Sequence, residues 1–154
     1  MKIIYYDTNR NADCESQLGA AYASVPELLR QSDYVSVHVP LLPATRHLIG
    51  AEQLKNMKRT SYLVNTSRGP VIDEKALVAA LRKKQIAGAA LDVFENEPKL
   101  APGLAKLGNA LLTPHSASAT ISARAAMSEM AAKNILAVLG GGKPINLVNT
   151  DVYS

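Results

Sequence analysis

Short apolar runs alternate with amphipathic segments along most of the chain. Five runs predict β-strands, because each is rich in β-branched, aromatic or other apolar residues and ends at a polar residue or proline: residues 2–7, 34–40, 61–66, 87–93 and 109–114. Helical periodicity and acidic-first, basic-last charge order predict helices between them: residues 25–33, 51–57 and 73–85, with a long alanine-rich helix over residues 118–139 before three glycines.

Most of these strands are apolar throughout instead of alternating, and helices separate them. That pattern is typical of a parallel sheet covered on both faces, the α/β doubly wound architecture. In such sheets ligands bind outside the carboxyl ends of the strands. The residues that follow each strand are therefore the first places to look for chemistry.

Composition narrows the function classes further. The 154 residues are 47% hydrophobic and 19% charged, and the net charge is 17 − 13 = +4. The basic residues lie in short runs at helix ends, so nucleic-acid binding is not expected. A single cysteine, Cys14, leaves no internal disulfide and suits a reducing compartment. No apolar run approaches the ~20 residues of a membrane span, so we expect a soluble, cytoplasmic protein that does not bind a membrane, and we expect no metal site.

The first predicted strand ends at Asp7. In a dinucleotide-binding sheet an acid at the end of the second strand accepts hydrogen bonds from the adenosine ribose and disfavours a 2′-phosphate. An acid that simply starts a turn is an equally good interpretation. Arg10 lies close by, so NADP stays open beside NAD.

Charged side chains also follow the later strands. Arg68 stands before Gly69, and its planar fork could bind a carboxylate, although a surface arginine in a tight turn is the alternative. Asp92 ends an apolar strand, where a carboxylate needs a dedicated partner. Glu97 and His115 follow the last two strands. An arginine, a carboxylate and a histidine so placed form a set that a reductase could use.

Two further histidines flank a rigid loop that contains Pro40 and Pro43. We expect His38 and His47 to be structural. The prolines offer an apolar wall against which a ring could lie.

Four stretches resemble the D-isomer-specific 2-hydroxyacid dehydrogenase family: "SDYVSVHVPLLPATRHLIG", "LVNTSRGPVIDEKALVAAL", "AGAALDVFENEP" and "LLTPHSASAT". They occur in the family's order and cover most of residues 32–120. The last part of this region is most similar to bacterial glyoxylate or hydroxypyruvate reductases. The resemblance implies a Rossmann-type NAD-binding domain and reduction of a small 2-oxo acid to the D-2-hydroxy acid by hydride transfer.

The resemblance also implies a role for each matching residue. Arg68 would bind the substrate carboxylate, and His115, paired with Glu97, would be the acid and base. Asp92 would contact the nicotinamide and Asp7 the ribose. The other residues expected to line the cofactor are Val39, Pro40, Thr66, Ser67, Ser116 and Ala117.

The chain departs from the family in one respect. The glycine-rich phosphate loop, which lies between the family's first strand and first helix, has no counterpart here. We therefore expect residues 1–116 to be the later portion of an NAD-binding domain without its first strand, with unpaired strand edges and an uncovered apolar face. Residues 117–154 would be a crossover helix and tail that return to a missing substrate domain.

Three interpretations stay open from the sequence. The chain is a truncated dehydrogenase completed as a homodimer or by a complementing N-terminal half, an inactive fragment, or an NAD-sensing interaction protein of the same fold. Loss of phosphate anchoring at a helix N-terminus favours the inactive fragment. The three interpretations differ in whether the chain binds cofactor and whether it turns over substrate.

Overall fold

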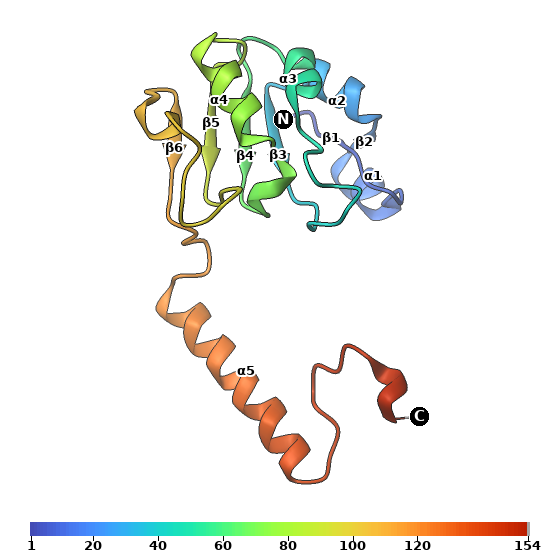
Figure 1. The fold of residues 1–154 in the computed structure, drawn as a ribbon. Helices are drawn as coiled ribbons and strands as arrows, with labels where there is room; N and C mark the ends of the chain where they lie inside the picture. Colours follow the sequence, from blue (N-terminus) through green and yellow to red (C-terminus); the bar gives the residue numbers. More distant parts are fainter. Residues whose placement is uncertain (154) are drawn as a thin grey trace. The chain divides into compact units, whose positions relative to one another are not determined.

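The computed structural model describes residues 1–153 of the chain (Figure 1). These residues form two compact units, which divide between His115 and Ser116, and each is described by itself. The first unit contains every strand among the described residues, and the second contains one long helix and a tail.

A four-stranded parallel sheet forms the centre of the first unit. Its strands are β3 (Tyr34–Val37), β4 (Tyr62–Asn65), β5 (Gly88–Leu91) and β6 (Ala110–Leu112), and they lie in the order β3-β4-β5-β6. Asn65 pairs with Leu91, and Leu91 pairs with Leu112, so the carboxyl ends of β4, β5 and β6 lie level at one edge. This α/β arrangement confirms the predicted parallel sheet and places three predicted site segments side by side.

A separate two-stranded parallel sheet pairs β1 (Ile4–Tyr5) with β2 (Ala21–Tyr22). The sequence pattern missed β2 and also missed the helix α1 (Ala12–Leu18) that connects the two strands. Asn11 accepts a hydrogen bond from the Cys14 backbone at the start of α1, and Gly19 ends it in the left-handed conformation at φ 61°. Within the described residues, no further strand pairs with the second edge of β1 or of β3.

Helices α2 (Val25–Gln31), α3 (Ala51–Asn56) and α4 (Glu74–Arg82) cover one face of the larger sheet. Helix α2 packs on α3, and α3 packs on α4. The apolar sides of these helices meet alternate strand residues in a core that includes Leu29, Leu54, Leu63, Leu77, Leu81 and Leu91. Short 3-10 segments, η1 (Gly69–Val71) and η2 (Leu104–Lys106), complete this side.

The opposite face of the sheet is open within this unit. Along β3, buried Val35 and Val37 alternate with exposed Tyr34. Tyr34 is 71% exposed, and its ring stacks on that of Tyr62 in β4 with centroids 5.6 Å apart. Leu111 in β6 is also exposed. Apolar side chains are therefore exposed on this face within the unit.

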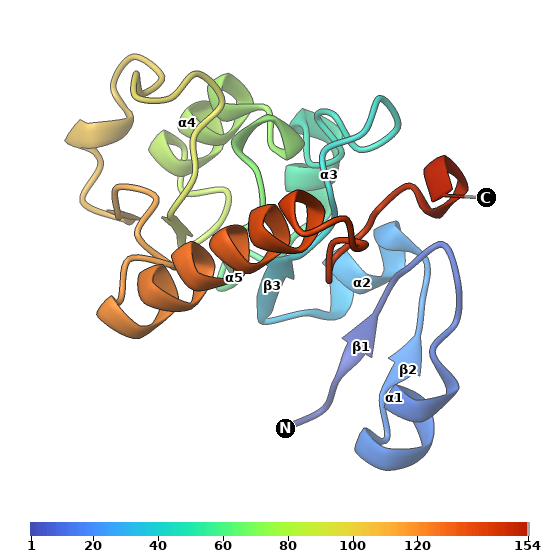
Figure 2. The same cartoon turned by 90° about the horizontal axis from the view of Figure 1, so that it is seen from below.

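The second unit consists of α5 (Ile121–Leu139) and a tail that ends in η3 (Thr150–Tyr153) (Figure 2). The Thr120 hydroxyl accepts the Ala123 N–H at the start of α5. Asn134 and Asn146 exchange two hydrogen bonds of 3.0 and 3.1 Å, which tie the tail back to the helix. Over the described residues, neither α5 nor any other helix combines the length and apolar character needed to cross a membrane.

Candidate active site

The turn that follows β4 is built on Asn65, a polar side chain that is 1% exposed. Its Oδ1 accepts hydrogen bonds from both the N–H and the hydroxyl of Ser67, each 3.0 Å long. Its Nδ2 donates to the Arg68 carbonyl oxygen over 3.0 Å. Asn65 thereby closes the turn and presents Arg68 at the edge of the sheet. The sequence interpretation treated Asn65 as an ordinary strand residue and missed this role.

Arg68 itself is exposed, and its Nη1 donates to the Ser67 carbonyl over 2.7 Å. Among the described residues it forms no hydrogen bond or ion pair with a carboxylate. Gly69 brings the turn against the loop that follows β5, since a Cβ added there would lie 1.9 Å from the Phe94 carbonyl carbon. Only a glycine allows two backbone segments to approach this closely.

Asp92 stands at the end of β5 and is buried. The Thr113 hydroxyl, beyond the end of β6, donates to its Oδ1 over 2.6 Å. A buried carboxylate requires such a partner, as the sequence predicted. The bond ties the two neighbouring strand ends together.

Glu97 and His115 form a pair across the next two loops. The distance between His115 Nδ1 and Glu97 Oε2 is 2.9 Å, although the two residues are 18 positions apart in the chain. The other carboxylate oxygen, Oε1, accepts the Phe94 N–H over 3.0 Å. The hydrogen bond from His115, followed by that from Phe94, lowers the pKa of Glu97. His115 has a left-handed backbone, with φ 52°.

A hollow of about 340 Å³ lies beside this pair. It is lined mainly by apolar side chains, together with the polar Glu97, Thr113 and His115; the apolar members are Phe94, Pro98, Leu100, Leu112 and Pro114. An apolar hollow with a few convergent polar groups is the usual form of a small-molecule site. The pair can supply a proton there, because Glu97 occupies Nδ1 of His115 and leaves Nε2 for a ligand.

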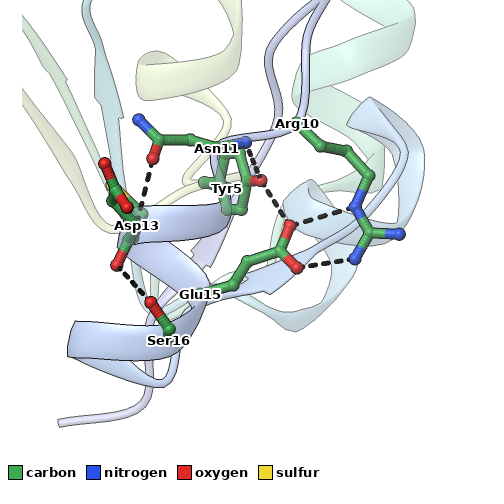
Figure 3. Close-up of polar contacts among 7 residues, drawn as sticks. Tyr5, Arg10, Asn11, Asp13, Glu15 and Ser16 are labelled. Carbon is green, nitrogen blue, oxygen red and sulfur yellow. Dashed lines mark hydrogen bonds and ion pairs between the residues drawn. The ribbon is translucent and has the colours of Figure 1, made fainter.

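A second hollow, of about 390 Å³, is lined by residues 7 and 9–13 beyond β1. Asp7 is exposed there, and N–H and hydroxyl donors from Asn9 and Thr8 lower its pKa. Arg10 is held by Glu15 through two hydrogen bonds of 3.0 and 2.7 Å (Figure 3). Its guanidinium also lies 5.6 Å from the centroid of the Tyr22 ring. Arg10, the cation that could favour the 2′-phosphate of NADP, is therefore already paired with Glu15.

The remaining predicted cofactor residues are placed less specifically. Val39 and Pro40 follow β3, and Thr66 follows β4, so all three lie at carboxyl strand ends. Ser116 and Ala117 belong to the second unit. The histidine of the proline loop, His47, bonds to Glu95 over 2.7 Å, as expected of a structural histidine. In the described part of the chain no cluster of three potential ligands could hold a metal ion.

Comparison with known proteins bears directly on these strand ends. Residues 1–117 match the family model described as "D-isomer specific 2-hydroxyacid dehydrogenase, NAD binding domain". The chain belongs to this family. Its parallel sheet is accordingly a Rossmann-like fold, and the resemblance noted in the four sequence stretches is confirmed.

Family members named glyoxylate reductase are similar over the whole chain. That of Korarchaeum cryptofilum is 53% identical over 154 residues, which are 99% of this chain and 46% of the relative. That of Thermococcus litoralis is 51% identical and is matched over 100% of this chain and 46% of the relative. The chain thus spans about half the length of the curated relatives it matches.

Solved structures of the family share the fold. A glyoxylate reductase from Paecilomyes thermophila has a TM-score of 0.88 and 40% identity, over 98% of this chain and 46% of that one. The NAD-complexed D-isomer specific 2-hydroxyacid dehydrogenase from Lactobacillus delbrueckii ssp. bulgaricus has a TM-score of 0.84 and 36% identity, over 96% of this chain and 49% of that one. These matches support NAD as the cofactor of the fold.

Proposed function

We propose that this chain carries the catalytic residues of an NAD-dependent reductase that converts a small 2-oxo acid to the D-2-hydroxy acid. The observation that supports this function most directly is the Glu97–His115 pair, with its 2.9 Å bond, beside an apolar hollow. The Arg68 turn ends the neighbouring strand. A proton donor and a carboxylate-binding cation are the two groups that reduction of a 2-oxo acid requires.

The residues at the β1 end of the fold fit the adenosine ribose of an NAD molecule. Asp7 offers an exposed carboxylate to ribose hydroxyls, and the pairing of Arg10 with Glu15 favours NAD over NADP. When bound, NADH supplies the hydride that the carbonyl carbon of the substrate receives. Asp92, Val39, Pro40, Thr66, Ser67, Ser116 and Ala117 are the further residues that we propose line the cofactor.

His115 acts on the carbonyl oxygen of the substrate. Glu97 holds Nδ1, so the charged imidazole gives its proton from Nε2 as the oxygen becomes a hydroxyl. Glu97 remains ionised and stabilises the imidazolium, since its pKa is lowered by that same contact. Arg68 grips the substrate carboxylate and orients the carbonyl. In the reverse direction His115 is the base.

The substrate is small. The hollow of about 340 Å³ has room for a small 2-oxo acid, and the relatives in Korarchaeum and Thermococcus are named glyoxylate reductases. We therefore propose glyoxylate or hydroxypyruvate. A cytoplasmic location stays a prediction.

The working form contains more polypeptide than one copy of this unit. The open sheet face, with Tyr34 and Leu111 exposed, supports a covering partner. The second edges of β1 and β3, which are unpaired among the described residues, support it as well. A homodimer and a complementing N-terminal half are the two forms we propose, and sizing by gel filtration with mass spectrometry distinguishes them.

The test combines cofactor titration with turnover. NADH binding is followed by fluorescence, and NADH oxidation is followed with glyoxylate and with hydroxypyruvate. His115→Ala is expected to abolish turnover and leave NADH affinity unchanged. His38→Ala, which alters an exposed histidine bonded to Ser36, is the matched control and should keep full activity.

The outcomes separate the three interpretations. Turnover that survives His115→Ala contradicts the proposed mechanism. NADH binding by the unaltered chain without turnover favours an NAD-sensing protein, and absence of binding favours an inactive fragment.

A further inference from the structure

Glu74 is a buried carboxylate that the proposed chemistry does not use. It is the first residue of α4 and is only 4% exposed. Capping does not account for it, because the neighbouring Asp73 already accepts the Ala76 N–H over 2.9 Å. Burial raises the pKa of Glu74, so an ionised group at this position carries a cost in solvation free energy.

The partners of Glu74 lie in the loop of residues 94–101, which we call the Glu97 loop. Oε2 accepts the Ala101 N–H over 2.8 Å, and Oε1 accepts the Glu95 N–H over 3.4 Å. The Glu95 carboxylate in turn accepts the Glu74 N–H over 3.3 Å. One side chain therefore holds both ends of the loop, and Glu97 lies between the two points of attachment.

The anchored peptide also borders on both halves of the proposed site. Gly69, next to Arg68, leaves no room for a Cβ against the carbonyl of Phe94 and the nitrogen of Glu95. On the other side, the Phe94 N–H donates to the Glu97 carboxylate over 3.0 Å. The backbone on the two sides of the Phe94 Cα thus contacts both the Arg68 turn, through the Phe94–Glu95 peptide, and Glu97, through the Phe94 N–H.

We propose that Glu74 is a positioning residue for the reductase reaction, which holds the Glu97 loop so that Glu97 meets His115 beside the Arg68 turn. The inference rests on the proposed function of Glu97 and His115. Glu74 touches neither of them, and its effect passes through the backbone of Glu95 and Ala101.

The test follows the loop directly and needs neither cofactor nor substrate. Glu74→Gln replaces one acceptor oxygen by an amide nitrogen, so one loop N–H loses its partner. Hydrogen exchange of at least one of the Glu95 and Ala101 amides should accelerate about tenfold or more relative to the amides of β4, because a hydrogen bond to a charged group is lost. The titration of the Glu97 carboxyl, followed by ¹³C NMR, should move upward toward its ordinary range. Glu74→Asp keeps the charge, shortens the reach, and should change both signals in the same direction.

Leu77→Ala is the matched control for a general loss of stability. Leu77 lies on the same helix, is fully buried, and packs in the core. The Leu77→Ala substitution should lower the unfolding temperature without changing the titration of the Glu97 carboxyl in the folded protein. If Glu74→Gln behaves like Leu77→Ala, or leaves the exchange of both amides unchanged, the positioning role is wrong.

His115→Ala separates this inference from the function on which it rests. Loss of the imidazole should raise the Glu97 pKa, since the hydrogen bond from His115 is the largest cause of its lowering. If His115→Ala shifts the titration and both Glu74 variants do not, only the positioning role fails. If His115→Ala leaves it unshifted, the pair itself is wrong.

Discussion

Gly69 offers the most direct test of how the proposed site is packed. Substitution by alanine adds one methyl group beside Arg68 without touching any charged side chain. The added Cβ would lie 1.9 Å from both the carbonyl carbon and the oxygen of Phe94, and 2.5 Å from the Glu95 nitrogen. All three are backbone atoms, so no side chain can rotate away to make room.

The geometry sets the size of the effect. Ordinary van der Waals contact begins at 3.4 Å, so the turn and the Glu97 loop must separate by 3.4 − 1.9, or about 1.5 Å. Overpacking of a well-packed region costs about 1–3 kcal/mol, and a backbone clash belongs at the upper end. We expect Gly69→Ala to lower the free energy of unfolding by about 2–3 kcal/mol, which corresponds to roughly 5–10 °C in Tm.

Urea unfolding followed by far-UV circular dichroism measures this change. Gly108→Ala is the matched control, because a Cβ at Gly108 meets no atom within 4 Å. That variant should be neutral or more stable by up to about 1 kcal/mol, since alanine restricts the unfolded chain. Equal stability of the two variants would refute the close packing of the Arg68 turn on the Glu97 loop.

Three further predictions concern the polar contacts of the site. Because the pKa of Glu97 in the folded protein is lowered from its ordinary value of 4.5, the ionised carboxylate stabilises the protein above pH 4.5, and this stability is lost as the pH falls through the lower folded pKa. The difference in free energy of unfolding between the wild type and Glu97→Gln, from urea titrations at several pH values, should therefore shrink on acidification. A constant difference would contradict the pairing with His115. Asn65→Ala leaves the Ser67–Arg68 turn without its three hydrogen bonds and should cost about 2–3 kcal/mol in thermal unfolding, whereas an unchanged Tm would show that the turn does not depend on it. Thr113→Val removes the hydroxyl that donates to buried Asp92 and should lower stability by about 1–3 kcal/mol; in a double-mutant cycle the loss should shrink when Asp92 is already replaced by Ala, which has no acceptor at that position.

The elements that the sequence predicted are those with a strong apolar pattern. All five expected strands form, in shortened versions. β3, β4 and β5 bury apolar side chains, whereas Ile4 and Tyr5 of β1 are only half-buried. Helix α1 was missed because none of its residues is buried, so it has no apolar stripe to read. Its signals were its caps, Asn11 and Gly19. The two-residue strand β2 depends on pairing with β1, which no local pattern reveals.

Prediction of the site followed a similar division. Glu97 and His115 came from their places after apolar strands and from the family motifs, and the structure joins them. Asn65 and Glu74 were missed, because the sequence shows them as a strand residue and as a helix-start acid. Glu74 becomes a buried anchor when the Glu97 loop, distant in sequence, folds over it, and Asn65 becomes one when the turn at Ser67 and Arg68 closes on its side chain. The burial of these two polar groups is a tertiary property that their local sequence does not show, unlike that of Asp92, which ends an apolar strand.

The stacked rings of Tyr34 and Tyr62 give the protein a built-in optical probe. The chain has no tryptophan and six tyrosines, so its ultraviolet emission is tyrosine emission alone. Three others, Tyr5, Tyr6 and Tyr22, gather in ring contacts around β1 and β2. Tyr34 and Tyr62 contribute the tyrosine emission that comes from the open face of the larger sheet. Covering that face moves these two rings from water to protein, and the emission of the unlabelled chain changes with it.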